Sequence, residues 1–336
     1  MSLAEAQQIY SNGPLSTGIS SNSGALAPAG YTWSELQSET GNTTEANSLA
    51  GAGGIYTADE VNSVINTDDF VVPVGQVWNL NSVDVFVYQT TYTGTVPPVD
   101  QMRVQIFNGD PQFGGVPIAG NLTANVIDLP NSNDAQMLRI FNTTTPAPGI
   151  AIGSVRKIWK IRGTISATLP SGTYWVVYQL HSTNDDRSFF PPVTIPGTRG
   201  LAGWNAKQNV LASNAPGQQL GWAPLVDDGT PTTAPDFPLD FPFVINGTVT
   251  LGLSENSLQA NVLVYPNPVK NQLFVVVPNG VNLYSCEISD NSGRVVKSLQ
   301  SPNPVLEIDV ADLSTGNYFL KLQSDNGMAV KKFIKE

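Results

Sequence analysis

The chain has few charged side chains, one cysteine and one histidine. Of its 336 residues only 13% are charged, whereas a globular domain usually carries about 25%. The lone Cys286 excludes an internal disulfide, and one Cys with one His is too few for a His/Cys zinc site. The same scarcity leaves little room for Ser-His-Asp or Cys-His catalysis. No apolar run reaches about 18 residues, so we predict no transmembrane segment.

Charge is unevenly distributed along the chain. Residues 261–336 hold seven basic and seven acidic residues, whereas residues 1–260 hold nine basic and twenty acidic ones. The first part therefore carries the whole net charge of −11. This step in charge predicts a domain boundary near residue 260. An acidic larger part argues against a nucleic-acid partner, because phosphate backbones recruit basic surfaces.

Short runs of β-branched and aromatic residues dominate residues 55–250. They alternate with period two and end in turn residues, as strands of an antiparallel sheet do. The clearest runs are 83–88, 103–107, 156–161, 174–180 and 243–251. No segment with helical periodicity competes. We therefore predict an all-β fold in which residues 55–250 form one large antiparallel β-sandwich, similar to a jelly roll.

The first 54 residues differ from the rest. We interpret Met1-Ser2-Leu3 as an expression remnant and Ala4-Glu5-Ala6 as the end of a secretory signal peptide, so that the mature chain begins near Gln7. Residues 11–54 are rich in Ser, Asn, Gly, Thr and Ala. They predict a loop or polar arm that is fixed where Trp33 packs. Residues 1–54 thus precede the sandwich as a separate arm.

Two segments have the signature of a tyrosine corner, in which a tyrosine hydroxyl bonds the backbone a few residues upstream. One is Leu169–Trp175, with Gly172 and Tyr174, and the other is Leu313–Phe319, with Gly316 and Tyr318. We expect each glycine to permit the tight turn that crosses between sheets. One signal in each part of the chain supports two sandwiches.

The last 75 residues follow a polar linker, residues 251–261, and consist of closely spaced strand patterns. Seven runs fit strands of a small Ig-like sandwich over residues 262–336. The runs are 263–265, 273–277, 284–289, 294–299, 305–310, 317–323 and 329–334.

Four ordered motifs in this region resemble the type A C-terminal sorting domain of type IX secretion system cargo proteins. They are Val264-Tyr265-Pro266-Asn267-Pro268, the segment 290–296 around Gly293-Arg294, the segment 308–322 around Gly316 and Tyr318, and Lys331-Lys332-Phe333-Ile334-Lys335. All four are at the usual spacing and end at the C-terminus. The resemblance covers under a quarter of the chain. It assigns a sorting role to Tyr265, Pro266, Asn267, Pro268, Gly293, Arg294, Gly316, Tyr318, Lys332, Phe333 and Lys335.

The resemblance implies a route for the protein. In the family, the outer-membrane translocon of a Gram-negative bacterium reads this domain. A sortase-like peptidase then usually removes it, and the cargo is released or attached to surface lipopolysaccharide. The implied location is secreted or on the outer cell surface. The physics agrees, because Pro266 and Pro268 fix φ, Asn291-Ser292-Gly293 suits a hairpin turn, and three lysines give the end positive charge.

Catalysis is a weak prediction for the cargo part. From residue 61 to 254 the acids are thirteen Asp and no Glu, and most of them lie beside Gly, Pro, Asn or another Asp, as turn formers do. His181, at a strand end, lacks an evident nucleophile, and Cys286 fits a buried apolar position. We therefore expect no enzyme and no cofactor. An Asp-dependent glycan-degrading enzyme stays open as an alternative, because two Asp can flank a glycosidic bond.

A loop-like stretch of the cargo part combines aromatic and polar residues. Trp204 and Trp222 offer flat faces on which a sugar ring can stack, and Asn205 and Arg199 lie close to Trp204 in sequence. The alternative is that both tryptophans plug the core at one end of the sandwich. Oxygen ligands for a calcium ion are available in Asp185, Asp186, Asp227 and Asp228. Because their spacing is not that of an EF-hand, we predict no metal site.

We therefore expect a secreted or surface-exposed protein whose cargo domain is a non-catalytic binding or adhesion module, with carbohydrate as the preferred ligand class. A purely structural surface protein is the third possibility. An exposed tryptophan on a flat or grooved face favours the binding module. Two carboxylates facing each other across a cleft favour the enzyme.

Overall fold

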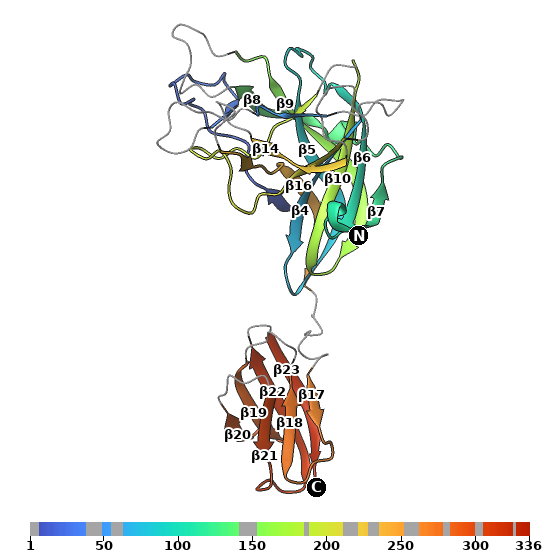
Figure 1. The fold of residues 1–336 in the computed structure, drawn as a ribbon, viewed down its shortest axis with the longest axis vertical. Coiled ribbons are helices and arrows are strands. Elements are labelled where there is room, and N and C mark those ends of the chain that lie inside the picture. The colour runs from blue at the N-terminus through green and yellow to red at the C-terminus, as the bar shows by residue number, and fades with distance from the viewer. Residues whose placement is uncertain are drawn as a thin grey trace. The chain divides into compact units, whose positions relative to one another are not determined.

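A computed structural model describes residues 7–37, 49–54, 63–140, 153–184, 188–210, 221–227, 235–251, 262–277, 283–299, 305–324 and 327–336. The chain divides into two compact units, Met1–Leu251 and Gly252–Glu336. Strands dominate both units (Figure 1). The expected cleavage motif at residues 4–6 and most of the expected linker lie outside the described residues.

The larger unit is a sandwich of two main sheets. One sheet runs in the order β1-β16-β5-β9-β8-β2, with β11 and β3 attached beside β5, and the other runs β13-β12-β4-β10-β6-β7. A short pair, β14 and β15, lies apart from both. The strands are β1 (Gln7–Asn12), β2 (Thr32–Glu35), β3 (Ala52–Gly53), β4 (Val64–Val72), β5 (Gln76–Tyr88), β6 (Val99–Asn108), β7 (Val116–Asn121), β8 (Asn133–Ile140), β9 (Lys157–Leu169), β10 (Gly172–Ser182), β11 (Phe189–Phe190), β12 (Lys207–Val210), β13 (Gly221–Pro224), β14 (Val226–Asp227), β15 (Phe237–Pro238) and β16 (Phe243–Leu251).

Alternating apolar residues from both sheets form the core between them. Phe70 of β4 stacks on Trp78 of β5 with 6.0 Å between ring centroids and an interplanar angle of 4°. Val83, Val85 and Val87 of β5 are completely or almost completely buried, as period-two alternation on a half-covered sheet predicts. The all-β sandwich expected from the sequence is therefore confirmed. Among the described residues, the helical elements are two 3-10 turns, η1 (Pro111–Phe113) and η2 (Leu129–Asn131), and no helix could span a membrane.

The first residues are part of this sandwich, which corrects the expected separate arm over residues 1–54, although Trp33 packs as predicted. β1 pairs with β16, and β2 pairs with β8 in the parallel direction. Trp33 and Leu36 are both 2% exposed, and Trp33 packs with Leu138 and Ile140. The segment is polar because it lies at sheet edges, where few side chains face the core. Its composition therefore resembled that of a loop.

The smaller unit has the seven expected strands. They form a three-stranded sheet, β17-β18-β21, and a four-stranded sheet, β20-β19-β22-β23. Their bounds are β17 (Leu263–Tyr265), β18 (Gln272–Val276), β19 (Leu283–Asp290), β20 (Val295–Leu299), β21 (Val305–Asp309), β22 (Gly316–Ser324) and β23 (Gly327–Lys335). A separate apolar core includes Val269, Leu273, Leu320 and Phe333. Cys286 is 2% exposed within this core, and burial raises the pKa of its thiol to about 12.

Both tyrosine corners are present. The Tyr174 hydroxyl donates to the Pro170 carbonyl at 3.0 Å, and the Tyr318 hydroxyl donates to the Ser314 carbonyl at 2.8 Å. The glycines act differently from our expectation. Gly172 and Gly316 begin strands and are not among the residues with positive φ. Gly172 lies under the tyrosine ring, whose nearest atom would be 3.4 Å from an added Cβ.

The corner in the larger unit predicts a measurable loss of stability in Tyr174→Phe. Removing the hydroxyl leaves the Pro170 carbonyl without this donor, and one such bond contributes about 1 kcal/mol. All six tryptophans lie in the larger unit, so tryptophan fluorescence during urea denaturation of the full chain reports on that unit. Tyr318→Phe is the matched control, because it removes the same bond in the other unit. Equal fluorescence midpoints for Tyr174→Phe and wild type would contradict the role of the corner.

Candidate functional site

The motif Tyr265–Pro268 lies against the end of the chain. Asn267 accepts a hydrogen bond from the Ile334 backbone N–H at 2.9 Å and donates to the Lys332 carbonyl at 3.3 Å. An amide side chain that bonds a backbone N–H and a backbone carbonyl in this way takes the place of a neighbouring strand. The first and last sorting motifs, about 65 residues apart in sequence, are therefore one structural feature.

Val269 continues this contact along β23. Its N–H donates to the Ile334 carbonyl at 2.8 Å, and its carbonyl accepts from the Glu336 N–H at 2.9 Å. Val269 is fully buried and forms a parallel bridge with Lys335. Because β23 is the last strand of its sheet, residues 267–269 close the C-terminal part of an edge that would otherwise offer free backbone groups.

The motif around Gly293 forms the predicted turn between β19 and β20. Asp290 accepts hydrogen bonds from the Ser292 hydroxyl at 2.6 Å, the Ser292 N–H at 2.9 Å and the Arg294 N–H at 3.1 Å. These bonds, the one from the Ser292 side chain first, lower the pKa of the Asp290 carboxyl. Gly293 has φ 80°, a value that favours glycine. Arg294 Nε bonds Asp290 at 3.0 Å, and the arginine side chain is 78% exposed.

The remaining sorting residues divide into core and surface. Tyr318 stacks on Phe333 with 5.6 Å between ring centroids, and both are buried. Lys332 is exposed, but Lys335 is only 7% exposed and its ammonium bonds the Glu336 carbonyl. Of these two predicted lysines, Lys332 thus lies on the surface, whereas the parallel bridge to Val269 holds Lys335 against the domain.

In the larger unit, the four predicted ligand residues have different environments. Arg199 is 1% exposed, and its Nε bonds Asp227 Oδ2 at 3.1 Å. Its guanidinium also lies over the Phe237 ring, 4.6 Å from the centroid. The expected ligand role of Arg199 is therefore corrected to a buried structural one, because the ion pair and the ring take up the charge inside the unit.

Asn205 and Trp204 face inward rather than forming a sugar platform together. The Asn205 N–H donates to Asp240 Oδ1 at 2.7 Å, and its side chain bonds Asp69. Trp204 is partly buried against the main core. Trp222 is half-buried in β13, where it pairs with Asn209 of β12. Stacking of a sugar ring on Trp222 stays a prediction. Residues 211–220, which connect β12 to β13, lie outside the described ranges.

Two carboxylates of the larger unit form a coupled pair. Asp68 is completely buried, where it accepts from the Phe241 N–H at 2.6 Å, the Asp69 N–H at 2.8 Å and the Asn12 amide at 3.0 Å. Burial, then the charge of Asp240, raises the pKa of Asp68 well above its usual value. Burial also raises the pKa of Asp240 to about 6. The Asp68 carboxyl has no solvent-facing surface, so this pair joins β1, β4 and the segment before β16 rather than flanking a cleft.

The calcium hypothesis rests mostly on undescribed residues. Asp185, Asp186 and Asp228 lie outside the described ranges, and Asp227 is bonded to Arg199. Within the part of the chain that the structure describes, no three His, Cys, Asp or Glu side chains gather to hold a metal ion. His181, which lies in β10, has its Nδ1 2.6 Å from Asp100 Oδ1.

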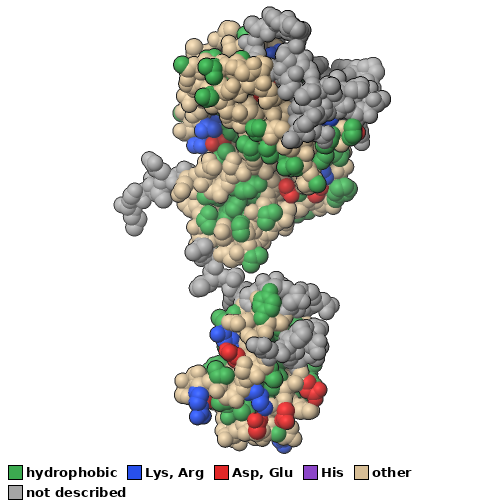
Figure 2. All heavy atoms as spheres, turned by 90° about the vertical axis from the view of Figure 1, so that its left-hand side faces the viewer, with side chains coloured by type: hydrophobic (Ala, Val, Ile, Leu, Met, Phe, Trp, Pro, Cys, Tyr) green, Lys and Arg blue, Asp and Glu red, His purple; other side chains and the backbone are tan. Residues whose placement is uncertain are grey.

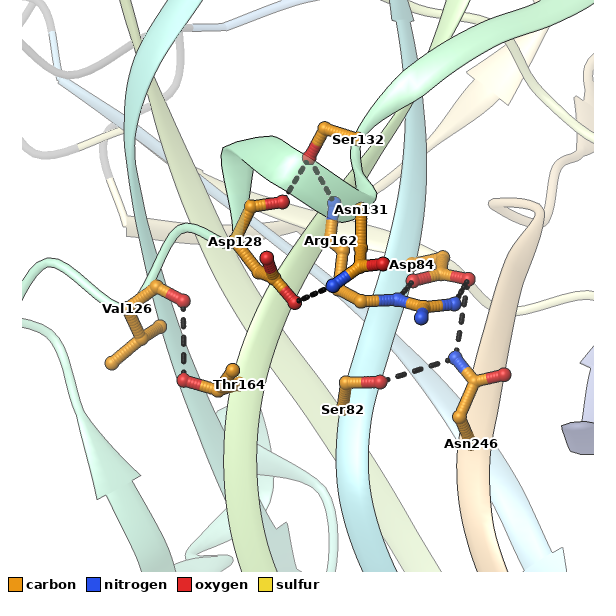
Figure 3. Close-up of polar contacts among 9 residues, drawn as sticks. All are labelled: Ser82, Asp84, Val126, Asp128, Asn131, Ser132, Arg162, Thr164 and Asn246. Atoms are coloured by element: carbon orange, nitrogen blue, oxygen red, sulfur yellow. Dashed lines mark hydrogen bonds and ion pairs between the residues drawn. The ribbon is translucent and has the colours of Figure 1, made fainter. Parts of the chain in front are cut away.

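A polar network that the sequence did not reveal lies on the outward side of β16, β5 and β9 (Figure 3). Arg162 of β9 donates to both oxygens of Asp84 of β5, at 2.6 and 2.7 Å. Asn246 of β16 donates to Asp84 at 3.1 Å and to Ser82 at 3.3 Å. Period-two alternation in these three strands was the only signal in the sequence that placed these residues on one face. The pairing register that brings them together could not be predicted from the sequence.

Next to this network the surface is hollowed. A hollow of about 370 Å³ is lined by Leu80, Asn81, Thr164, Ile165 and Ser166. It lies where the register between β5 and β9 shifts, between Leu80 and Ser82. A bulge of this kind interrupts the hydrogen-bond ladder and redirects side chains. The result is a shallow, open depression in the surface, with polar side chains at its rim.

Comparisons with known proteins address mainly the smaller unit. Residues 263–336 match the family described as the secretion system C-terminal sorting domain. No curated protein matches the chain. A solved structure of PorZ, described as an essential bacterial surface component of the type-IX secretion system of Porphyromonas gingivalis, is 20% identical over 29% of this chain and 14% of its own, with a TM-score of 0.21.

A second solved structure, the group B streptococcus pilus 2b backbone protein, is 9% identical over 83% of this chain and 86% of its own, with a TM-score of 0.14. In the comparison with PorZ, by contrast, the chain spans only about a seventh of that protein's length. Neither structural likeness assigns a fold or an activity to the larger unit.

Asn267→Ala tests the closure of the β23 edge. The variant loses the bonds to Ile334 and Lys332, so we expect faster amide hydrogen exchange at Ile334 and a loss of about 1 kcal/mol in the stability of the smaller unit. Asn271→Ala is the control, because Asn271 is exposed and its side chain makes no hydrogen bond to the described residues. Unchanged exchange at Ile334 in the Asn267 variant would show that the amide does not hold the edge.

The raised pKa of Asp240 predicts that the stability of the larger unit depends on pH. Its folded pKa of about 6 exceeds the reference value of 3.8, so its contribution is fully present below pH 4 and is lost as pH rises through 6. The free energy of unfolding of wild type, relative to Asp240→Asn, should therefore fall between about pH 4 and 6 and stay level above. Urea denaturation followed by tryptophan fluorescence measures both proteins, and parallel curves across this range would refute the raised pKa.

Proposed function

We propose that this protein, which carries a type IX secretion sorting domain at residues 263–336 and is therefore exported to the cell surface or secreted, is a non-catalytic binding or adhesion protein whose larger unit binds carbohydrate. The sorting domain implies an interaction with the secretion machinery. The same proposal includes three finer steps. The translocon of a Gram-negative outer membrane recognises the sorting domain, a sortase-like peptidase removes it, and the larger unit is attached to lipopolysaccharide.

One observation carries the carbohydrate assignment. The hollow beside the Asp84–Arg162 pair is lined by two hydroxyls, an amide and two aliphatic side chains. The hollow is shallow and open to solvent, with a volume of about 370 Å³. Its hydroxyl and amide groups can exchange hydrogen bonds with sugar hydroxyls, whereas the side chains of Leu80 and Ile165 are buried in the core.

The surface of the larger unit fits the same proposal. Figure 2 shows one face of each unit, with charged side chains sparse on the larger unit and closer together on the smaller one. A weakly charged face lacks the strong field that recruits an ionic partner. Contacts with an uncharged, hydroxyl-rich ligand remain available to it.

Binding of the full chain to polysaccharides tests the proposal. We expect retention of the protein on at least one immobilised glycan, without release of reducing ends and without loss on adding a calcium chelator. The panel should hold neutral, N-acetylated and acidic polysaccharides. Release of reducing ends would instead support the Asp-dependent glycan-degrading enzyme. Retention by none of them would support a purely structural surface protein.

A further inference from the structure

The outward side of β16, β5 and β9 carries a row of cross-strand polar pairs. Ser82 lies opposite Asn246 on one side and Thr164 on the other, and Asp84 lies directly opposite Arg162. These side chains face the same way because residues in register share a face of a sheet. Figure 3 shows them gathered on neighbouring strands.

Asp84 fixes the guanidinium of Arg162. The Asp84 side chain is 2% exposed and accepts three hydrogen bonds, two from Arg162 and one from Asn246. A buried carboxylate is tolerated when its oxygens are satisfied in this way. The planar guanidinium bound through two nitrogens keeps one orientation. Its third nitrogen, Nη1, makes no hydrogen bond to the described residues, and the Arg162 side chain is 20% exposed.

Thr164 joins this pair to the hollow. It follows Arg162 by two residues on β9, lines the hollow, and is exposed. Asn81 and Ser166 are the other exposed lining residues, whereas the side chains of Leu80 and Ile165 belong to the core. Polar donors and acceptors thus line the hollow, next to a donor that is already oriented.

We propose that this hollow is the glycan-binding site of the larger unit and that it selects uncharged or amino sugars over acidic ones. The inference rests on the proposed function and adds the site and the ligand class. The Thr164 hydroxyl donates to the Val126 carbonyl at 3.3 Å (Figure 3), so its oxygen is left to accept from a sugar hydroxyl. Ser166 and Asn81 bond further sugar hydroxyls, and Arg162 Nη1 donates one more hydrogen bond. The charge of Arg162 is balanced by Asp84, so a ligand carboxylate gains little from it.

The surrounding charge has the same effect on specificity. Asp128 contributes to the electrostatic environment of Arg162, and residues 1–260 hold twenty acidic against nine basic residues. Residues 1–260 as a whole thus carry net negative charge, which opposes the approach of a uronic acid but not that of an uncharged or amino sugar. Because like charges in proximity oppose binding, the selectivity follows from the protein and not from one contact.

The double variant Thr164→Val with Ser166→Ala tests the site in the full chain. Calorimetry with cellohexaose, a chitosan hexamer and hexagalacturonate gives the dissociation constants. We expect at least tenfold weaker binding of whichever uncharged or amino probe wild type prefers. Thr248→Val is the matched control, because Thr248 is an exposed hydroxyl on the neighbouring strand β16; it should change the affinity less than twofold. Equal weakening by control and double variant would overturn the assignment of the hollow.

Asp84→Asn tests the selectivity. Without its internal counter-charge Arg162 is free to pair with a ligand carboxylate, so we expect the affinity for hexagalacturonate relative to cellohexaose to rise at least tenfold. Tryptophan fluorescence checks that the variant folds. Asp128→Asn serves if it does not, because it removes a nearby negative charge without breaking the Asp84–Arg162 pair; it should shift the same ratio about threefold. An unchanged ratio in a folded variant would refute the charge argument.

The two proposals fail in different ways. If wild type binds no glycan, the proposed function and this inference both fail. If wild type binds a glycan and the Thr164/Ser166 variant binds it equally well, the function stands and only the site is wrong. If wild type prefers hexagalacturonate, the site can stand only without the proposed selectivity, and the inference as stated is overturned.

Discussion

Asn267 bonds the backbone of β23 with both ends of its side-chain amide, and the arrangement of the sorting motifs depends on this contact. A sheet edge exposes backbone donors and acceptors that another chain can take up. In the smaller unit, the residues that precede β18 return to this edge and bond it at Lys332, Ile334 and Glu336. Motifs from the two ends of the domain therefore meet at one edge of the sheet.

The larger unit has the same constraint and meets it with its N-terminal segment. β1 and β2 are the outermost strands of the first sheet, and they come from the polar residues that precede the main strand runs. Asn12, at the end of β1, bonds the buried Asp68 of the opposite sheet. The edge strand is thus tied to the interior by a carboxylate whose pKa is raised by burial. The polar strand β1 is therefore an integral part of the sandwich.

Sequence patterns predicted what depends on local order. Period-two alternation located the major strands, and the spacing from Gly172 to Tyr174 and from Gly316 to Tyr318 predicted both corners, because a corner is formed within a few residues. Register is different. The pairing of Asp84 with Arg162 links residues 78 apart, and no local pattern specifies it. The burial of Arg199 likewise depends on Asp227 and Phe237, which reach it only through the folded chain.

The same distinction explains why neither the aromatic nor the polar residues chosen from the sequence pointed to the Asp84–Arg162 network. A tryptophan in a turn-rich stretch has equal reason to fill the core or to face solvent, and Trp204 packs against the core. A carboxylate and an arginine on outward positions of adjacent strands have fewer options, because each must find a partner or face water. Asp84 pairs with Arg162 of the adjacent strand and is buried there. The pairing register therefore set the position of Asp84, whereas the packing of the core set that of Trp204.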